Sequence, residues 1–199
     1  MKEEKEMTSE ESIRIIQQMI QSIQQEVRDN GFYFLLWGWL VFIASMWQFV
    51  AIQFNLSLPY WLGWMVLMPL GGIVTAIYGR KEEKERRVKT QFDEFLKYVI
   101  HAFLISLFLV LLAMPVLGEY CYPMVMLVYA IWLYISGGAL QFTALRVGAV
   151  INWLLAAACL FVKEIELQSL MLAAAVLLGY IIPGYMLKAK YYRSIKTSL

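Results

Sequence analysis

Residues 33–52 read YFLLWGWLVFIASMWQFVAI and carry no charged side chain. A helix needs about 20 apolar residues to cross the roughly 30 Å of hydrocarbon in a bilayer, so this stretch is long enough to span a membrane. Five further stretches have the same character: 60–80, 98–116, 122–141, 147–162 and 168–187. The stretch 147–162 is the shortest of them. The sequence therefore predicts an all-α polytopic membrane protein with six transmembrane helices.

Composition agrees with a membrane protein. The chain is 61% hydrophobic and its mean hydropathy is +0.61, while only 16% of its residues are charged, against about 25% in soluble domains. None of the 15 Asp and Glu residues falls inside a predicted span. The basic residues alternate with acidic ones beside apolar stretches, which argues against a nucleic-acid partner. The lipid bilayer is thus the first predicted partner.

The six spans pair as three hairpins, linked by the short segments 55–59, 117–121 and 163–167. Of the 17 Lys and Arg residues, all but Lys163 lie on the other side of the spans from these links. Because basic residues stay in the cytoplasm, we predict a multi-pass protein of the bacterial inner (cytoplasmic) membrane with both termini inside. The predicted topology anchors are Arg80, Lys81, Arg86, Arg87 and Arg146.

Residues 1–31 predict a cytoplasmic amphipathic helix. Thr8 and Glu11 have the spacing of a capping box, and Asn30-Gly31 is a natural stop. Apolar residues recur at alternating intervals of three and four at Ile13, Ile16, Ile20, Ile23 and Val27. This narrow stripe favours either a helix that lies on the membrane or on the ends of the spans, or a face for self-association or a soluble partner.

Residues 32–190 form the predicted transmembrane domain, and 191–199 its cytoplasmic tail. Within the domain, the loop 81–97 is highly charged, and its acids precede its bases by four residues, which supports a helix. That helix either continues into the third span or breaks near Thr90, where Thr90 and Asp93 have capping spacing. We interpret the loop as a solvated, positive-inside face, with an anionic-lipid or protein contact as the alternative.

Little in the sequence predicts an enzyme. The spans offer no carboxylate for a proton relay or cation site, the chain has one His, and no zinc motif or phosphate loop is present. We predict no catalytic residue, metal or cofactor. Three candidate intramembrane polar contacts remain: Gln48, His101 and Asn152. Buried amides usually hydrogen-bond a neighbouring helix, and His101 is either an interfacial side chain or a pH-sensitive one.

Four short runs carry a resemblance: WGWLVF at 37–42, MPLGGI at 68–73, YGRK at 78–81 and YIIPGY at 180–185. With these the chain resembles a family of small six-span bacterial inner-membrane proteins for which no activity is established. The resemblance implies the six-helix architecture and adds no catalytic or binding residue.

Two functions follow as hypotheses. The first is a non-enzymatic membrane protein that acts through its cytoplasmic helices, as a homo-oligomer or by binding a cytoplasmic protein partner. The alternative is a small transporter or channel for a neutral or weakly charged solute, which predicts a water-accessible cavity near Gln48 or Asn152. A structural subunit without independent activity is a third possibility.

Overall fold

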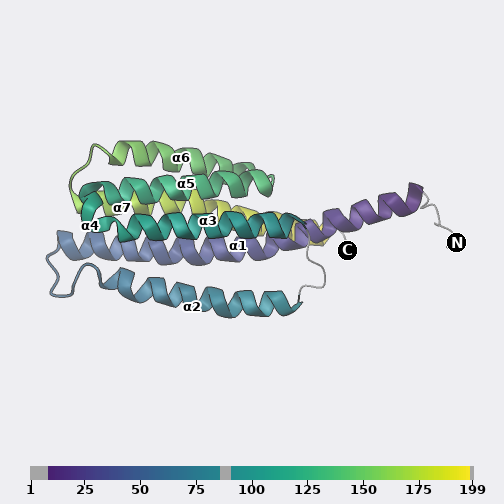
Figure 1. The fold of residues 1–199 in the computed structure, drawn as a ribbon, viewed down its shortest axis with the longest axis horizontal. Helices are drawn as coiled ribbons and strands as arrows, with labels where there is room; N and C mark the ends of the chain where they lie inside the picture. Colours follow the sequence, from purple (N-terminus) through teal and green to yellow (C-terminus); the bar gives the residue numbers. More distant parts are fainter. Residues whose placement is uncertain (1–8, 86–90, 198–199) are drawn as a thin grey trace.

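The fold is a bundle of helices. A computed structural model describes residues 9–85 and 91–197, and the side chains of residues 31–81 and 97–190. Every element in these described ranges is helical, as predicted. Most helices run side by side along one long axis, and both chain ends lie toward the same end of that axis (Figure 1). In the described residues, four segments are long and apolar enough to cross a membrane: Gly31–Gln53, Leu62–Lys81, Met114–Ala139 and Ile165–Lys190.

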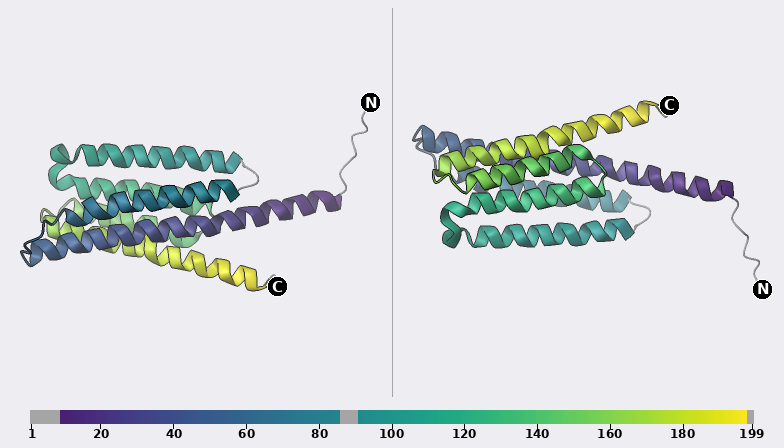
Figure 2. Two further views of the ribbon diagram at one scale, coloured as in Figure 1. Left: turned by 90° about the horizontal axis from the view of Figure 1, so that it is seen from below. Right: turned by 90° about the horizontal axis from the view of Figure 1, so that it is seen from above.

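Helix α1 is one continuous rod from Ser9 to Gln53. The helix end predicted at Asn30-Gly31 is therefore not present. A glycine inside a helix costs only about 1 kcal/mol relative to alanine, whereas stopping there would leave backbone groups without intrahelical partners. Figures 1 and 2 show the N-terminal part of α1 projecting well beyond the bundle.

Helix α2, Leu62–Glu85, returns beside α1 and includes the start of the charged segment. Residues 86–90 lie outside the described part of the chain, and α3 runs from Gln91 to Leu112. The predicted break near Thr90 lies outside the described residues. The apolar part of α3, Lys97–Leu112, is shorter than the four long apolar segments.

The middle of the chain forms the tightest hairpin. After α4, Met114–Leu117, and the 3-10 turn η1, Gly118–Tyr120, helix α5 runs from Cys121 to Ala139. Gln141 adopts a left-handed backbone with φ 48° and reverses the chain into α6, Thr143–Cys159. An added Cβ on Gly137 would lie 2.8 Å from the backbone nitrogen of Arg146, so α5 and α6 approach closely because this position has no side chain.

The last three elements follow one another without a gap: α7, Ile165–Val176, the π-helical turn η2, Leu177–Ile181, and α8, Ile182–Thr197. In η2 the N–H of Ile182 donates to the carbonyl of Leu177, five residues back. Pro183 has no N–H for the carbonyl of Gly179 and its ring would clash with it in a regular helix. The proline accounts for the wider turn that precedes it.

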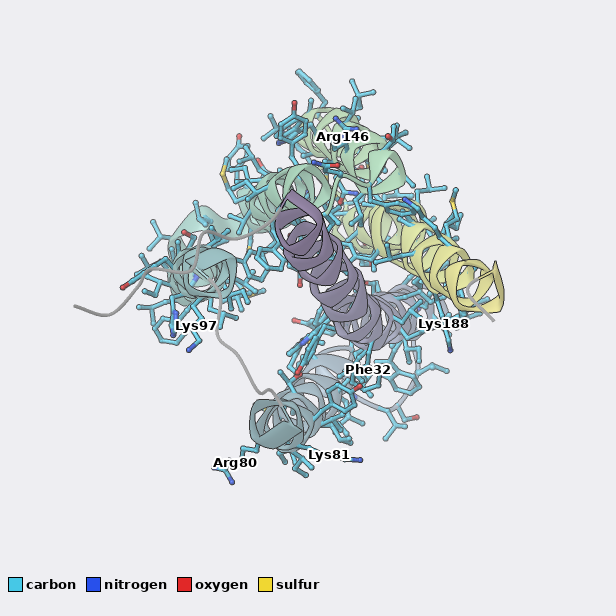
Figure 3. All side chains as sticks on the ribbon, turned by 90° about the vertical axis from the view of Figure 1, so that its right-hand side faces the viewer. Phe32, Arg80, Lys81, Lys97, Arg146 and Lys188 are labelled. Atoms are coloured by element: carbon cyan, nitrogen blue, oxygen red, sulfur yellow. The ribbon has the colours of Figure 1, made fainter. Side chains whose placement is uncertain are left out.

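The core lies where α1, α5, α6 and α7 meet. Its largest fully buried side chains include Met126, Leu133, Leu145 and Leu172. We call the end of the bundle with Arg80, Lys97, Arg146 and Lys188 the basic end (Figure 3). The opposite end, with the links between α1 and α2 and between α6 and α7, is called the hairpin end (Figure 1).

Candidate functional site

Gln48 joins three helices. It lies on α1, is 2% exposed, and accepts hydrogen bonds at Oε1 from Trp64 Nε1 of α2, at 2.6 Å, and from the Tyr122 hydroxyl of α5. Sequence reasoning singled out Gln48 but did not identify its two partners. An amide oxygen has two lone pairs, so this one acceptor satisfies two aromatic donors. The arrangement fixes the relative positions of α1, α2 and α5.

Asn152 joins α6 to α7. Its Nδ2 donates to the carbonyl of Gly148, at 2.9 Å, and to that of Ala175, at 3.0 Å. The side chain is fully buried, and its Oδ1 has no hydrogen-bond partner among the described residues. Asn152 also contacts Gly179, where an added Cβ would meet Nδ2 at 2.2 Å. The amide therefore packs directly on the π-helical turn.

His101 and Arg146 lie on the surface, apart from these two buried amides. His101 Nδ1 lies 2.7 Å from the carbonyl of Lys97, one turn earlier in the same helix. Arg146 Nη2 donates to Thr143 Oγ1 at 3.0 Å, again within its own helix. Neither contact joins two helices. The three predicted polar contacts Gln48, His101 and Asn152 thus do not meet in one site.

The structure describes the side chains of only some of the other predicted residues. Arg80 and Lys81 are exposed at the basic end (Figure 3). Arg86 and Arg87 lie outside the described residues. For the N-terminal stripe, the structure describes the backbone, which belongs to α1, but not the side chains: Ile13, Ile16, Ile20, Ile23 and Val27.

Gln168 is a contact that sequence reasoning missed. Its Nε2 donates to the carbonyls of Glu119, at 2.8 Å, and Val162, at 2.6 Å, and ties α7 to two links at the hairpin end. It begins the sixth predicted span, so a polar residue at a span end was the available signal. Ser45 and Ser136 were also missed; both hydroxyls are buried without a partner among the described residues.

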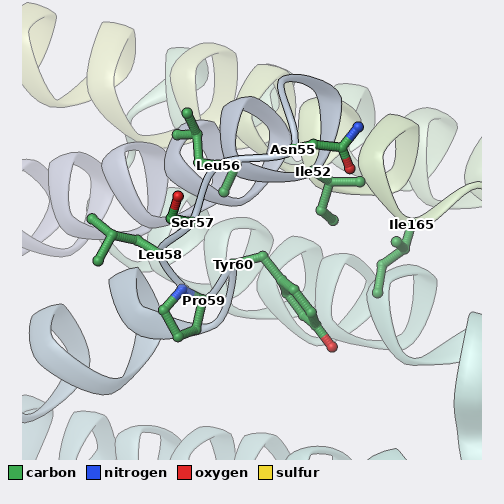
Figure 4. Close-up of a pocket in the computed structure, with 9 residues that line it drawn as sticks. Ile52, Asn55, Leu56, Ser57, Leu58, Pro59, Tyr60 and Ile165 are labelled. Atoms are coloured by element: carbon green, nitrogen blue, oxygen red, sulfur yellow. The ribbon is translucent and has the colours of Figure 1, made fainter.

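A depression of about 510 Å³ lies at the hairpin end (Figure 4). Residues 55–60 line one side of it and Ile165 of α7 the other. Its polar side chains are neutral: Asn55, Ser57 and Tyr60. Gln48 and Asn152, near which the transport hypothesis predicts a cavity, do not line this depression.

The described residues offer no assembled set of metal ligands. No cluster of three or more His, Cys, Asp or Glu side chains occurs among them. Cys121 and Cys159 are buried and free. The hydrogen bonds of Gln48, Asn152 and Gln168 join separate elements of the bundle, which is a structural role. No known protein family, curated protein or solved structure matches this chain.

Proposed function

We propose that the chain is a six-span protein of the bacterial inner membrane with both termini in the cytoplasm. The four long apolar segments support membrane insertion. Two arguments support six spans over four. Helices α3 and α6 lie alongside α5 on the same axis (Figure 1), and their apolar parts, Lys97–Leu112 and Thr143–Cys159, correspond to about 24 and 26 Å of helix. The basic end would then be the cytoplasmic end.

The activity we propose is non-enzymatic: the protein presents a cytoplasmic helical arm, residues 9–30, through which it self-associates or binds a soluble partner. One observation carries this proposal, namely that α1 runs unbroken from Ser9 to Gln53. The arm is therefore the N-terminal part of the same helix that contacts α2, α7, η2 and α8 in the bundle. Because the helix has no break, a partner that binds and moves the arm would also move α1 within the bundle.

The sequence of the arm supports the choice of a protein partner. Its apolar stripe repeats every 3.5 residues on average, the period of helix pairs, and its other positions are rich in Gln and charge. In proteins, most of the stability of a helix comes from packing of its amphipathic face rather than from helix propensity. The arm has four acidic and two basic residues, and this excess of negative charge disfavours an anionic lipid surface as its main contact.

The test is crosslinking in native membranes. Deleting residues 1–30 should abolish a crosslinked oligomer or partner, and the stripe variant Ile16→Lys/Ile23→Lys should do the same. The matched control, Gln18→Lys/Gln25→Lys, adds the same charge about 200° around the helix from the stripe and should retain the crosslink. Assembly that survives the deletion of residues 1–30 intact contradicts the proposal.

A further inference from the structure

The apolar stripe of the arm continues as the buried face of α1 in the bundle. The intervals of three and four residues that separate the stripe positions, from Ile13 to Val27, lead on to five residues of the bundle: Gly31, Phe34, Gly38, Val41 and Ser45. All five are buried. At about 100° per residue, the stripe positions and these five lie within one arc of about 80° around the helix axis. Because α1 is unbroken, the stripe is on the side through which α1 packs in the bundle.

The turn η2 and helix α8 cover this face of α1 as far as Gly31. An added Cβ on Gly38 would lie 3.0 Å from Ile181 Cγ1, and one on Gly31 would lie 3.7 Å from Leu187 Cδ2. Beyond this last contact, α1 and α8 diverge toward the basic end (Figure 2). Residues 188–197 of α8 rise about 15 Å and residues 9–30 of α1 about 33 Å. Helix α8 therefore ends beside the base of the arm and does not follow the stripe.

Charge divides this region into two parts. Past Leu187, α8 carries four basic residues and no acidic one: Lys188, Lys190, Arg193 and Lys196. The side chains of Lys188 and Lys190 are exposed. On the arm, uncharged residues occupy positions that border the stripe: Gln17, Gln21 and Gln24. A molecule that covers both parts would therefore be apolar along the arm and acidic beside α8.

We propose that the stripe and the basic end of α8 form one docking surface for a soluble protein, which lays an amphipathic helix along the arm in continuation of α8. The end of that helix nearest the membrane carries carboxylates, which lie beside Lys188 and Lys190. This surface rests on the proposed function of the arm and names the chemistry of its partner. The face of α1 that packs on η2 and α8 packs on the partner beyond them, as amphipathic helices do in grooves. The basic residues favour a partner with complementary charge.

A second copy of this chain fits the stripe less well. Each bundle holds its own η2 and α8 against the stripe side of α1, so two copies turned toward each other through these sides meet at α8. Neighbouring helix axes lie about 8–10 Å apart, and three such spacings keep the two α1 axes about 27 Å apart. Paired arms need about 9 Å. An unbroken α1 does not bend to close that distance.

The experiment is photocrosslinking of the full chain in living cells, with benzoylphenylalanine at one position at a time. Placed at Ile16 or Ile23, it should crosslink to one soluble protein, which mass spectrometry identifies. Placed at Lys188, it should crosslink to the same protein. Placed at Gln18, on the far side of the arm, it should give little product.

Two insertions after Asn30 test whether the arm and α8 act as one surface. Two alanines turn the arm by about 200° relative to α8 and should abolish the crosslink from Ile16. Four alanines turn it by only about 40° and should retain the crosslink. Because alanine has the highest helix propensity, both insertions keep α1 helical and differ in the phase of the stripe.

Charge substitutions test the acidic end of the partner. Lys188→Gln/Lys190→Gln should lower the crosslink yield from Ile16 by about fivefold, since exposed ion pairs are individually weak. Arg80→Gln/Lys81→Gln removes two exposed charges from α2 at the same end of the bundle and should match the wild type.

The identity of the product decides between the occupants of the stripe. Equal crosslinks in the two insertion variants, a homodimer, or a product that joins the arm to α8 of the same chain would each overturn the composite surface. The lack of any soluble-protein product at Ile16 and Ile23 would overturn it as well. A soluble partner that persists after deletion of residues 1–30 would instead contradict the proposed function of the arm.

Discussion

At the scale of single residues, the glycine pair that ends α5 shows how selective the packing is. An added Cβ on Gly137 would lie 2.8 Å from the Arg146 backbone nitrogen and 2.9 Å from Leu145 Cβ, whereas one on Gly138 would meet nothing within 4 Å. Gly71 and Gly72 of α2 show the same contrast. In each pair one glycine permits a close helix contact and its neighbour faces open space.

Gly137→Ala should therefore lower the free energy of unfolding by about 2 kcal/mol, since the contact is with backbone and one of the two helices must move. Gly138→Ala, the adjacent control, should be neutral or stabilising by up to about 1 kcal/mol through helix propensity. Unfolding of the purified protein in mixed micelles, titrated with denaturing detergent, measures both. Equal effects of the two substitutions would show that α5 and α6 do not approach as closely as described.

The polar contacts show what sequence reasoning reaches at this scale. Gln48 and Asn152 were predicted as helix contacts because neutral amides are rare in apolar spans, and both are buried and bonded to other helices. Their partners were not predictable, because they depend on which helices are neighbours and at what height. The exposed position of His101 depends on the same information, since α3 packs through only one strip.

At the scale of elements, the local signals were reliable where hydrophobic length decided the outcome. Every predicted span coincides with helix over most of its length. The stop at Asn30-Gly31 failed because this signal is local, whereas the continuation of α1 gains the backbone hydrogen bonds of a long apolar helix. The π-helical turn was also missed, although Pro183 was its visible cause.

Gly31→Ala tests the continuity of α1. In a regular helix the substitution should raise the free energy of unfolding by up to about 1 kcal/mol, and the nearest foreign atom to its Cβ, Leu187 Cδ2, lies 3.7 Å away. A glycine that ended the helix in a left-handed conformation would give the opposite sign. Gly118→Ala is the matched control, because Gly118 has φ 53° and alanine there should destabilise. The same detergent titration measures whether each substitution raises or lowers the free energy of unfolding.

At the scale of the whole molecule, the order of contacts was beyond the sequence. Consecutive spans were predicted as three hairpins, and the pairs α1–α2, α3–α5 and α6–α7 do lie against each other. The sequence did not indicate that α5 and α6 form the tightest pair or that α1 packs along α7 and α8. Those contacts depend on side-chain shape, such as Gly137 against Leu145 and Gly184 against Leu35. Apolar periodicity carries little information when helices are apolar all round.

Topology is the whole-molecule property that labelling tests most directly. If only the four long apolar segments cross the membrane, the segment 114–139 begins at the inner side and ends at the outer side. Glu119 then lies near the inside and Gln141 lies outside. With six spans, Glu119 is outside and Gln141 is inside. The two arrangements thus assign these two exposed residues to opposite sides of the membrane.

We expect Glu119→Cys to react with a membrane-impermeant maleimide in cells whose inner membrane is intact and accessible, and Gln141→Cys to react only after that membrane is permeabilised. The background replaces the buried Cys121 and Cys159 with alanine. Ser57→Cys and Lys188→Cys are the controls, outside and inside in both arrangements.

The expectation follows from charge. Four spans would put Arg146 outside with Lys163, whereas six spans leave Lys163 as the only outer basic residue. The positive-inside rule favours the second distribution. The reverse labelling pattern would remove α3 and α6 from the membrane-spanning set, and with them the proposed six-span architecture.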